Sequence, residues 1–544
     1  MRKPVDRFTI ALALVYVVGV LVLGMQPLKT LVSSGYEGVY FKGGDESQYI
    51  MRMQDALERP WTDVSNAITS GATAPRGLQM TLFETFAGSL LPWTGFSATA
   101  LTVVLSVLLA PLAAVFLGLL ARELGASRRI ALFAAVLYFF LLFGPLRRVI
   151  HQSWSLPYTL GTLLLLLSWW REPFRGRTIA LGVLLGLVPG VYFWSWTYLW
   201  AVFGILTALG IAERFAHREP RVVKSLVFHA FSCGLIALVT ALPFFTLMWL
   251  NAHHPAADDT SIRSSLIAAR EFESVKRSLV LLILMLSTVL WALRSAEWKR
   301  AMPLLSFTLA LFAVLHQQFI HGLVLSYWTH YYPYVCAVST LLLAVIFSHH
   351  RRGVIEYCTA AAAIVFLIGA FNDYKGRGSF ADPLPNYVQY QHLAGMLASL
   401  NAEELRQTVL SDRETSLIIG NSTRHDVVFT PFMRHVLVSD RELAERYCLT
   451  EMVRGIPPDT QWLAYDIREL SAAGRAGTQA VLDRNLEITK QACAWVMAHK
   501  KEALQKYGVS ELAWDERNHP DWRIDSKIFT ARVKGPGWSL WTLR

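Results

Sequence analysis

Long apolar runs alternate with short polar segments along the first two thirds of the chain. A helix of about 20 apolar residues is long enough to cross the hydrocarbon core of a bilayer. The pattern predicts eleven such spans, at 8–25, 97–121, 130–147, 156–170, 178–193, 196–213, 224–250, 278–294, 301–322, 327–347 and 354–371. The pair within 178–213 fits either two spans or one re-entrant hairpin.

The segment between the first two spans, 26–96, carries weaker periodicities. Ile50 and Met53 share an apolar face opposite Asp55, which predicts a helix lying on the bilayer surface. The stretch 77–86 is weakly amphipathic and predicts a second surface helix.

The chain becomes soluble in composition after Phe371, and strand-like runs alternate there with helical periodicity, as in an α/β domain. The predicted strands are 409–411, 417–419, 427–429, 435–438, 462–465 and 538–543, and the predicted helices are 387–404 and 472–507. We therefore expect a polytopic α-helical membrane domain over 1–371, which includes the external loop 26–96, and a soluble α/β domain over 372–544.

Composition agrees with a membrane protein, because 53% of the 544 residues are hydrophobic and only 17% are charged, against roughly 25% in soluble domains. The net charge of +11 comes from clusters between apolar runs, with no basic stripe among aromatics, so no nucleic-acid partner is expected. The segments that connect the predicted spans form two sets, one for each side of the membrane. The set that begins with residues 1–7 holds 18 Lys and Arg in 45 positions, whereas the other set holds 11 in 107 positions. The positive-inside rule then places the N-terminus in the cytoplasm and everything after Phe371 outside.

The five cysteines have no metal-ligand spacing. Cys233, Cys336 and Cys358 fall in predicted spans and fit small packing residues. Cys448 and Cys493 lie in the predicted exterior tail, where an oxidising compartment would allow them to form a disulfide.

The acidic pair Asp45 and Glu46 follows the first span at the start of the external loop. A carboxylate in that place suits a general base that takes the proton of an attacking hydroxyl. A structural explanation stands beside it, because Asp45 with Gln48 three residues on forms a capping-box pattern at a helix start.

The stretch Gly44-Asp45-Glu46-Ser47-Gln48-Tyr49, followed by Arg52, resembles the first external loop of the GT-C superfamily of membrane glycosyltransferases. The many-spanned body and the exterior tail are similar in outline. The resemblance implies an inverting transfer from a polyprenyl-phosphate sugar, which is the donor and not a cofactor, to a lipid, glycan or protein acceptor. It further implies a bacterial inner (plasma) membrane, with Asp45 as the preferred base and Glu46 as the alternate. No WWD signature of oligosaccharyltransferases is present.

A departing phosphate needs cations, and five residues at predicted external span ends are candidates. These are Arg147, Arg148, His151, Arg270 and His330, with Arg52 in the loop motif as a sixth. The two adjacent arginines also fit lipid-headgroup anchors. We expect His321 and His330 to face a cavity, and the aromatics at 192–198, Trp328 and Tyr331 to form an interfacial belt.

The loop 251–277 holds His253, His254, Asp258 and Asp259, which could bind a divalent metal or lie in a solvated loop. We expect the solvated loop, and no metal is assigned. Three other functions remain open for the chain as a whole. They are a polysaccharide polymerase or ligase, a transporter of lipid-linked glycans, and a non-catalytic scaffold of the cell envelope.

Overall fold

The structure is a computed structural model. It describes residues 6–33, 39–41, 44–57, 82–142, 151–263, 267–268, 275–294, 298–317, 319, 323–324, 327–348, 357, 359–365, 367–368, 387–389, 391–431, 433, 436–453, 460 and 478–544.

The chain divides by its internal contacts into two compact units. The helical unit comprises Met1–Pro27, Val104–Phe245 and Ala268–Pro385. The α/β unit comprises Leu28–Val103, Thr246–Ile267 and Asn386–Arg544. The sequence places the boundary at residue 371, whereas the contacts group segments of two predicted external loops with the tail.

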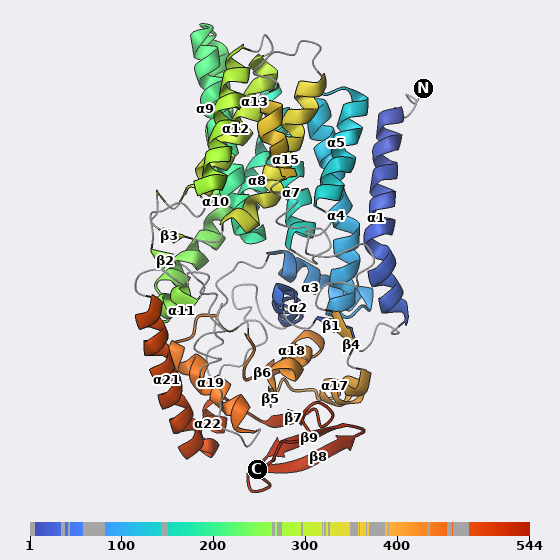
Figure 1. The fold of residues 1–544 in the computed structure, drawn as a ribbon, viewed down its shortest axis with the longest axis vertical. Coiled ribbons are helices and arrows are strands. Elements are labelled where there is room, and N and C mark those ends of the chain that lie inside the picture. The colour runs from blue at the N-terminus through green and yellow to red at the C-terminus, as the bar shows by residue number, and fades with distance from the viewer. Residues whose placement is uncertain are drawn as a thin grey trace. The chain divides into compact units, whose positions relative to one another are not determined.

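The helical unit consists of helices that run side by side (Figure 1). In chain order the helices that lie in it, wholly or in large part, are α1 (Arg7–Ser33), α4 (Ala98–Glu123), α5 (Arg128–Leu141), α7 (His151–Arg171), α8 (Arg175–Val191), α9 (Phe193–Ala216), α10 (Pro220–Ala252), α12 (Val275–Arg294), α13 (Trp298–Leu315) and α15 (Tyr327–Ser348). Each of the first ten predicted spans coincides with one of these helices, and residues 359–365 of the eleventh are helical.

Five helices in the described part of the chain are long and apolar enough to cross a membrane. They are Arg7–Met25, Ala98–Glu123, Phe193–Ala216, Pro220–Ala252 and His330–Ser348, and Ser278–Leu293 and Ala301–Leu315 are shorter apolar helices. These helices identify an integral membrane protein. The predicted number of eleven crossings stays a prediction.

The region 178–213 forms two helices. α8 ends at Val191 and α9 begins at Phe193, and the residue between them, Tyr192, is extended with φ −165° and ψ 124°. The two helices pack against each other, so the chain reverses direction at Tyr192.

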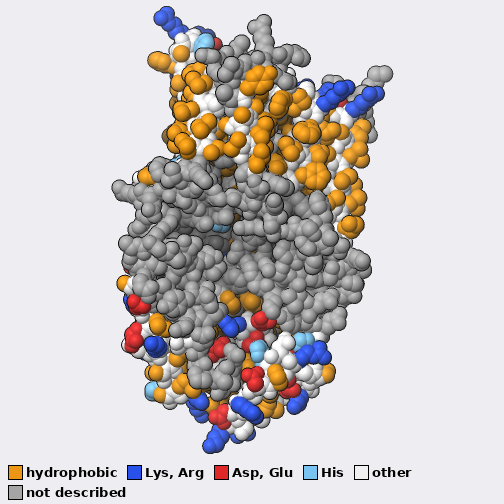
Figure 2. All heavy atoms as spheres, viewed as in Figure 1, with side chains coloured by type: hydrophobic (Ala, Val, Ile, Leu, Met, Phe, Trp, Pro, Cys, Tyr) orange, Lys and Arg blue, Asp and Glu red, His pale blue; other side chains and the backbone are white. Residues whose placement is uncertain are grey.

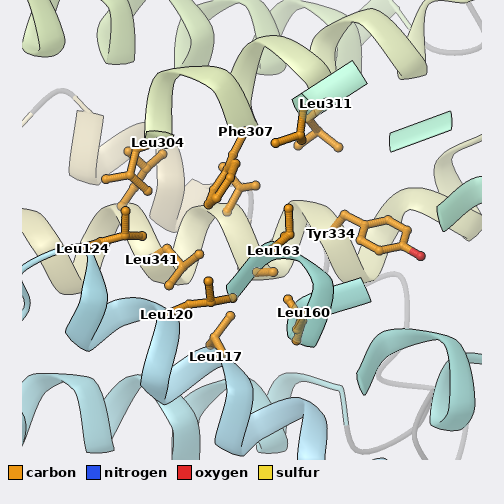
Figure 3. Close-up of a cluster of buried hydrophobic side chains, with 14 of the residues drawn as sticks. Leu117, Leu120, Leu124, Leu160, Leu163, Leu304, Phe307, Leu311, Tyr334 and Leu341 are labelled. Atoms are coloured by element: carbon orange, nitrogen blue, oxygen red, sulfur yellow. The ribbon is translucent and has the colours of Figure 1, made fainter. Parts of the chain in front are cut away.

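Leucine and aromatic side chains from several helices form the core of the helical unit. Leu117 of α4, Leu163 of α7, Phe307 of α13 and Leu341 of α15 are fully buried and point toward one another (Figure 3). The outer surface is apolar as well, as the orange side chains of Figure 2 show. Phe231 of α10 is 70% exposed. A soluble monomer does not expose an apolar surface of this extent, and lipid covers it in a membrane.

The α/β unit contains a five-stranded mixed sheet in the order β6-β5-β7-β9-β8. The strands are β5 (Thr408–Leu410), β6 (Asp426–Val427), β7 (Glu511–Trp514), β8 (Phe529–Gly535) and β9 (Trp538–Leu543). β5 is parallel to β6 and β7, and the other pairs are antiparallel. The turn from β8 to β9 places Gly537 at a φ of 86°, a conformation that favours glycine.

The remaining elements lie mainly in the α/β unit. In the α/β unit they are β1 (Val39–Phe41), α2 (Gly44–Asp55), α3 (Leu82–Thr94), α11 (Ala257–Arg263), β4 (Tyr387–Gln389), η1 (Gln391–Leu393), α17 (Ala394–Asn401), α18 (Arg413–Ser422), α19 (Asp440–Met452), α21 (Thr478–Ala498) and α22 (Lys500–Lys506). Two further two-residue strands are β2 (Ile267–Ala268) and β3 (Leu323–Val324). β1 pairs antiparallel with β4, which joins the first loop to the tail within this unit.

Several predictions for the tail are confirmed. β5 and β9 lie where strands are predicted, and the long helix predicted over 472–507 appears as α21 and α22, which separate at His499. The predicted strands 435–438 and 462–465 fall wholly or partly outside the described residues.

The strand predicted at 417–419 is wrong, because these residues lie inside α18. Asp412 caps that helix, and its Oδ1 accepts hydrogen bonds from the backbone N–H groups of Glu414 and Thr415. Leu417, Ile418 and Ile419 are all buried. A helix buried on every side carries a continuous apolar run, which periodicity alone does not distinguish from a strand.

Cys448 of α19 and Cys493 of α21 form a disulfide, with their Cα atoms 5.1 Å apart. The two helices also pack against each other. Cys233 and Cys336 are free and buried, as predicted for packing residues. Cys358 lies outside the described residues.

Candidate functional site

The acidic pair lies at the N-terminus of α2. This helix begins at Gly44, so Asp45 and Glu46 are its second and third residues. The first turn of a helix stabilises negative charge, because its backbone N–H groups and the helix dipole point toward it. The side chains of both residues lie outside the described part of the structure.

α2 is buried inside the α/β unit. The sequence predicts instead a helix that lies on the bilayer surface and exposes its polar face. Ile50, Met51 and Met53 are fully buried, and so is Asp55 on the predicted polar face. The helix packs against α3 on one side and against α18 on another. The polar face is buried because its charges find partners elsewhere in the α/β unit.

Arg52 forms an ion pair with Glu84 of α3. Arg52 Nη1 lies 3.6 Å from Glu84 Oε1, and the side chains are 0% and 5% exposed. Arg52 Nη2 also donates a hydrogen bond to Gln48 Oε1, at 3.3 Å. Burial raises the pKa of Glu84, although the charge of Arg52 opposes the shift. Arg52 is thus enclosed between α2 and α3 and holds the two helices together. The sequence predicts a different contact for it, with the donor phosphate.

Gln48 also bears on the capping hypothesis. A capping box needs the Gln48 side chain to reach back to the residue before the helix. In the structure its Oε1 accepts the hydrogen bond from Arg52, one turn further along α2. Because α2 begins at Gly44, Asp45 lies within the first turn instead of preceding it.

A second charge network joins the last residue of α2 to the sheet. Arg406 Nη2 lies 2.5 Å from Asp55 Oδ1 and 2.6 Å from Asp426 Oδ1. Burial alone lowers the pKa of Arg406, but the two carboxylates outweigh it and raise the pKa, so the guanidinium is charged. Both ends of this network lie in the α/β unit.

Close backbone packing adds to these charges. A Cβ atom placed on Gly88 of α3 would lie 2.4 Å from the carbonyl oxygen of Met53. Glycine at this position therefore allows α3 to approach the backbone of α2. Buried charges and a tight helix crossing together fix α2, and with it the first turn that carries Asp45 and Glu46.

His330 is placed in the helical unit, in the first turn of α15. Its Nδ1 lies 2.8 Å from the hydroxyl of Tyr192. Its ring stacks on Trp194, with centroids 4.5 Å apart and planes at 11°. These two contacts fix the orientation of the imidazole ring.

Two aromatic residues beside His330, Trp194 and Tyr331, are buried in protein, which corrects the prediction that they belong to a belt at the membrane interface. Trp194 is 8% exposed and Tyr331 is fully buried. The Tyr331 hydroxyl forms hydrogen bonds with Thr197 and with Gln317 Nε2. Tyr192 and Gln317 could not be recognised as partners from the sequence, because strings of Tyr and Trp occur both in belts and in buried clusters.

The other predicted phosphate-binding residues are described only in part. Arg147, Arg148 and Arg270, and also His321 and the side chain of Trp328, lie outside the described residues. His151 is the first residue of α7, and its side chain likewise lies outside the described part of the structure.

Of the candidate metal ligands in the loop 251–277, His253 and Asp259 have other partners. Asp259 Oδ2 accepts a hydrogen bond from the backbone N–H of Asp440, at 3.0 Å, and Asp259 pairs with Arg484. His253 Nδ1 lies 2.8 Å from the carbonyl oxygen of Trp249. Across the described residues, no group of three or more His, Cys, Asp or Glu could hold a metal ion.

One cavity of about 320 Å³ lies in the helical unit between α1 and α5. Its lining is apolar and includes Leu14, Val18, Val136 and Phe139. This chemistry fits a hydrocarbon chain, and none of the predicted site residues lines the cavity.

Comparison with known proteins gives similar structures only. No protein-family profile matches the chain, and no curated protein matches it in sequence. An oligosaccharyltransferase from Archaeoglobus fulgidus, crystallised with a tethered acceptor peptide, is 12% identical with a TM-score of 0.45, over 93% of this chain and 69% of that one. ArnT from Cupriavidus metallidurans, in the apo state, is 14% identical with a TM-score of 0.38, over 75% of this chain and 85% of that one. Both are GT-C glycosyltransferases. A likeness at these scores does not by itself assign an activity or a substrate to this chain.

Proposed function

We propose that the chain is a membrane glycosyltransferase that moves a sugar from a polyprenyl-phosphate carrier to an acceptor hydroxyl on a lipid, a glycan or a protein. Asp45 is the proposed base, and Glu46 is its alternate. The observation that carries the proposal is the position of this pair in the first turn of α2, a buried helix that two charge networks hold. A reactive group held by a rigid element is the general requirement for catalysis.

The reaction is a single displacement. The carboxylate accepts the proton of the acceptor hydroxyl while the hydroxyl oxygen forms a bond to the anomeric carbon of the sugar. The bond from that carbon to the phosphate oxygen breaks at the same time, and the polyprenyl phosphate leaves with the electron pair. One displacement inverts the configuration at the anomeric carbon.

The leaving phosphate requires positive charge close by. Arg147, Arg148, His151, Arg270 and His330 are the residues that we propose for it. For His330 there is structural support, since it is the fourth residue of the 22-residue helix α15 and N-terminal turns attract anions. Arg52 is not part of this set, because it is enclosed with Glu84.

Two observations support a site on the outer face of the membrane. The basic residues cluster in linkers on the opposite side of the predicted spans. In addition, the α/β unit contains the Cys448–Cys493 disulfide, and disulfides persist in oxidising compartments outside the cytoplasm.

The experiment measures transfer from polyprenyl-phosphate hexoses and pentoses, labelled in the sugar, by the full chain in proteoliposomes. Asp45→Asn and Glu46→Gln are tested singly and together. Glu502→Gln is the matched control, because Glu502 is also the third residue of a helix, α22, and is exposed.

We expect the double variant to lose transfer by a factor of about 100 or more, as for removal of a general base, while Glu502→Gln retains it. Transfer by the double variant at the wild-type rate would refute the assignment of the base. Movement of the intact lipid-linked sugar across the bilayer without transfer would instead favour a transporter.

A further inference from the structure

We propose that Arg406 is a positioning residue for the acidic pair. By binding Asp55 at the far end of α2, it fixes α2 to the sheet of the α/β unit and so determines where Asp45 and Glu46 lie. The expected effect on sugar transfer rests on the proposed function. The expected effect on the position of α2 rests on geometry alone.

The contacts of Arg406 are short and enclosed. Its Nη2 lies 2.5 Å from Asp55 Oδ1 and 2.6 Å from Asp426 Oδ1. The Arg406 side chain is 20% exposed, whereas that of Asp55 is 0% exposed. Charge-assisted hydrogen bonds of this length are stronger than neutral ones, and burial of the Asp55 side chain reduces their screening by solvent.

The backbone beside Arg406 is itself held by the sheet. The N–H of Gln407 donates to His425 Nδ1 at 3.0 Å, and the N–H of Asp426 donates to the carbonyl oxygen of Gln407 at 2.8 Å. Thr408, two residues beyond Arg406, pairs with Asp426 across the parallel strands β5 and β6. Arg406 therefore extends from a fixed point of the sheet.

Asp55 is an unfavourable residue for its position unless a cation is present. It is the last residue of α2, where the negative end of the helix dipole repels a carboxylate. Its side chain has also left water, which costs several kcal/mol for an unpaired charge. The pairing with Arg406 offsets both terms, which explains how a carboxylate can end this helix.

Loss of Arg406 would act on the opposite end of the helix. Asp55 and Asp426 would remain, two carboxylates that had shared one guanidinium nitrogen. Their repulsion would move Asp55 away from the sheet. Because α2 is a rigid rod of 12 residues, about 18 Å long, a tilt at Asp55 displaces the first turn.

The test uses the full chain in lipid nanodiscs with two readouts. Hydrogen exchange of the peptide covering 44–55, followed by mass spectrometry, reports the order of α2 without any assumption about activity. The kcat and KM of sugar transfer report the catalytic consequence. The variants are Arg406→Gln, Asp55→Asn and the two combined.

Arg532→Gln is the matched control. Arg532 is 25% exposed and also bridges two carboxylates. Glu511 lies in β7 and Glu403 follows α17, so neither lies on α2. This variant removes the same kind of network from the same unit. We expect it to lower the thermal midpoint while leaving exchange of the peptide 44–55 as in the wild type.

Arg406→Gln is expected to speed exchange of α2 and to lower kcat at least tenfold with KM for the carrier unchanged, since a misplaced base costs about 10 to 100-fold in rate. Adding Asp55→Asn should return both readouts to the values of Asp55→Asn alone, because the repelling charge is removed. The inference is overturned if Arg406→Gln leaves the hydrogen exchange of α2 unchanged. It is also overturned if the double variant exchanges as fast, and transfers as slowly, as Arg406→Gln.

Two further outcomes keep the inference separate from the proposed function. If Arg406→Gln does not accumulate as folded protein, Asp55→Asn alone must still exchange faster in α2 than the wild type, and equal exchange overturns the inference. If the wild type transfers no sugar, the proposed function fails, whereas the exchange readout still decides whether Arg406 fixes α2.

Discussion

Arg52 Nη1 lies 3.6 Å from Glu84 Oε1, and neither side chain is more than 5% exposed. This pair joins α2 to α3 from inside the protein. A buried ion pair differs from a surface pair in what its loss costs, because the remaining charge has neither partner nor water.

Glu84→Gln is therefore expected to destabilise the α/β unit strongly. Breaking a buried pair by removing one partner costs about 3–5 kcal/mol. The double variant Arg52→Met with Glu84→Leu should regain most of this loss, because it buries apolar side chains in place of two charges. Thermal unfolding in detergent, followed by hydrogen exchange of peptides from the α/β unit, measures both.

The same double variant tests the sequence prediction that Arg52 binds the donor phosphate. Since the guanidinium is enclosed with Glu84, the KM for the polyprenyl-phosphate sugar should remain within about twofold of the wild type. A change of that size is typical of substitutions that remove no specific interaction. A tenfold rise in that KM would return Arg52 to the phosphate site.

Gly88→Ala is expected to disturb the crossing of α2 and α3. The added methyl group would lie 2.4 Å from the carbonyl oxygen of Met53, so one helix has to shift. Overpacking of this kind costs about 1–3 kcal/mol. The control is Gly204→Ala in α9, where a Cβ meets nothing within 4 Å.

In Gly88→Ala we also expect faster hydrogen exchange of the peptide 44–55 and a lower kcat. Gly204→Ala should be neutral or slightly stabilising, because alanine restricts the unfolded chain and fits a helix. Equal stability of the two variants would show that α3 does not hold α2 by close packing.

These contacts explain which features the sequence could predict. Period and run length identified the helices of the membrane body and the strand β9, because both depend on residues close together in the chain. The partners of α2 could not be found in this way. Glu84 and Arg406 are 32 and 351 positions from their partners, and only the folded α/β unit brings them together.

Ambiguous patterns account for two further differences. The run Leu417-Ile418-Ile419 is apolar at every position, and the cap from Asp412 selects the helix that burial alone does not specify. The aromatic residues around Trp194 fit a membrane belt and a buried cluster equally well in the sequence. In the structure, the ring of Trp194 stacks on His330. In both cases the deciding contact is with a residue that the local pattern does not contain.

Removal of the Cys448–Cys493 disulfide is expected to lower the stability of the α/β unit. The bond closes a loop with a sequence separation of 45, for which chain entropy gives about 4 kcal/mol. Cys448→Ser with Cys493→Ser should lower the thermal midpoint, and a reductant should lower that of the wild type toward the same value. A reductant that also shifts the double variant would assign the effect to another group.

His425 is expected to make the α/β unit less stable in mild acid. The ring is fully buried, and burial lowers its pKa below the ordinary value of 6.5, with the neighbouring Arg424 and Arg406 acting in the same direction. The neutral ring is fixed by Leu400, whose carbonyl oxygen lies 2.7 Å from Nε2, and by the N–H of Gln407 on Nδ1.

Proton uptake by the unfolded chain sets the direction of this effect. Below pH 6.5 the unfolded chain takes up a proton on His425 that the folded chain does not, so stability is complete above that pH and falls as the pH decreases. Thermal midpoints between pH 8 and pH 5 should show this fall, and His425→Gln should reduce it. His499→Gln, which changes the exposed N-cap residue of α22, is the control. A fall that both variants reduce equally would remove the assignment to His425.

His330→Gln is expected to weaken binding of the donor through its phosphate. The imidazole is held by the Tyr192 hydroxyl and stacks on Trp194. Loss of a charge-assisted hydrogen bond costs about 1.5–3 kcal/mol, so the KM for the carrier should rise about 10 to 100-fold while the KM for the acceptor is unchanged. His316→Gln is the matched control, because both nitrogens of His316 are bound, by Phe312 and Ser278. A rise in KM that is equal in the two variants would assign the effect to packing of the helices and remove His330 from the phosphate site.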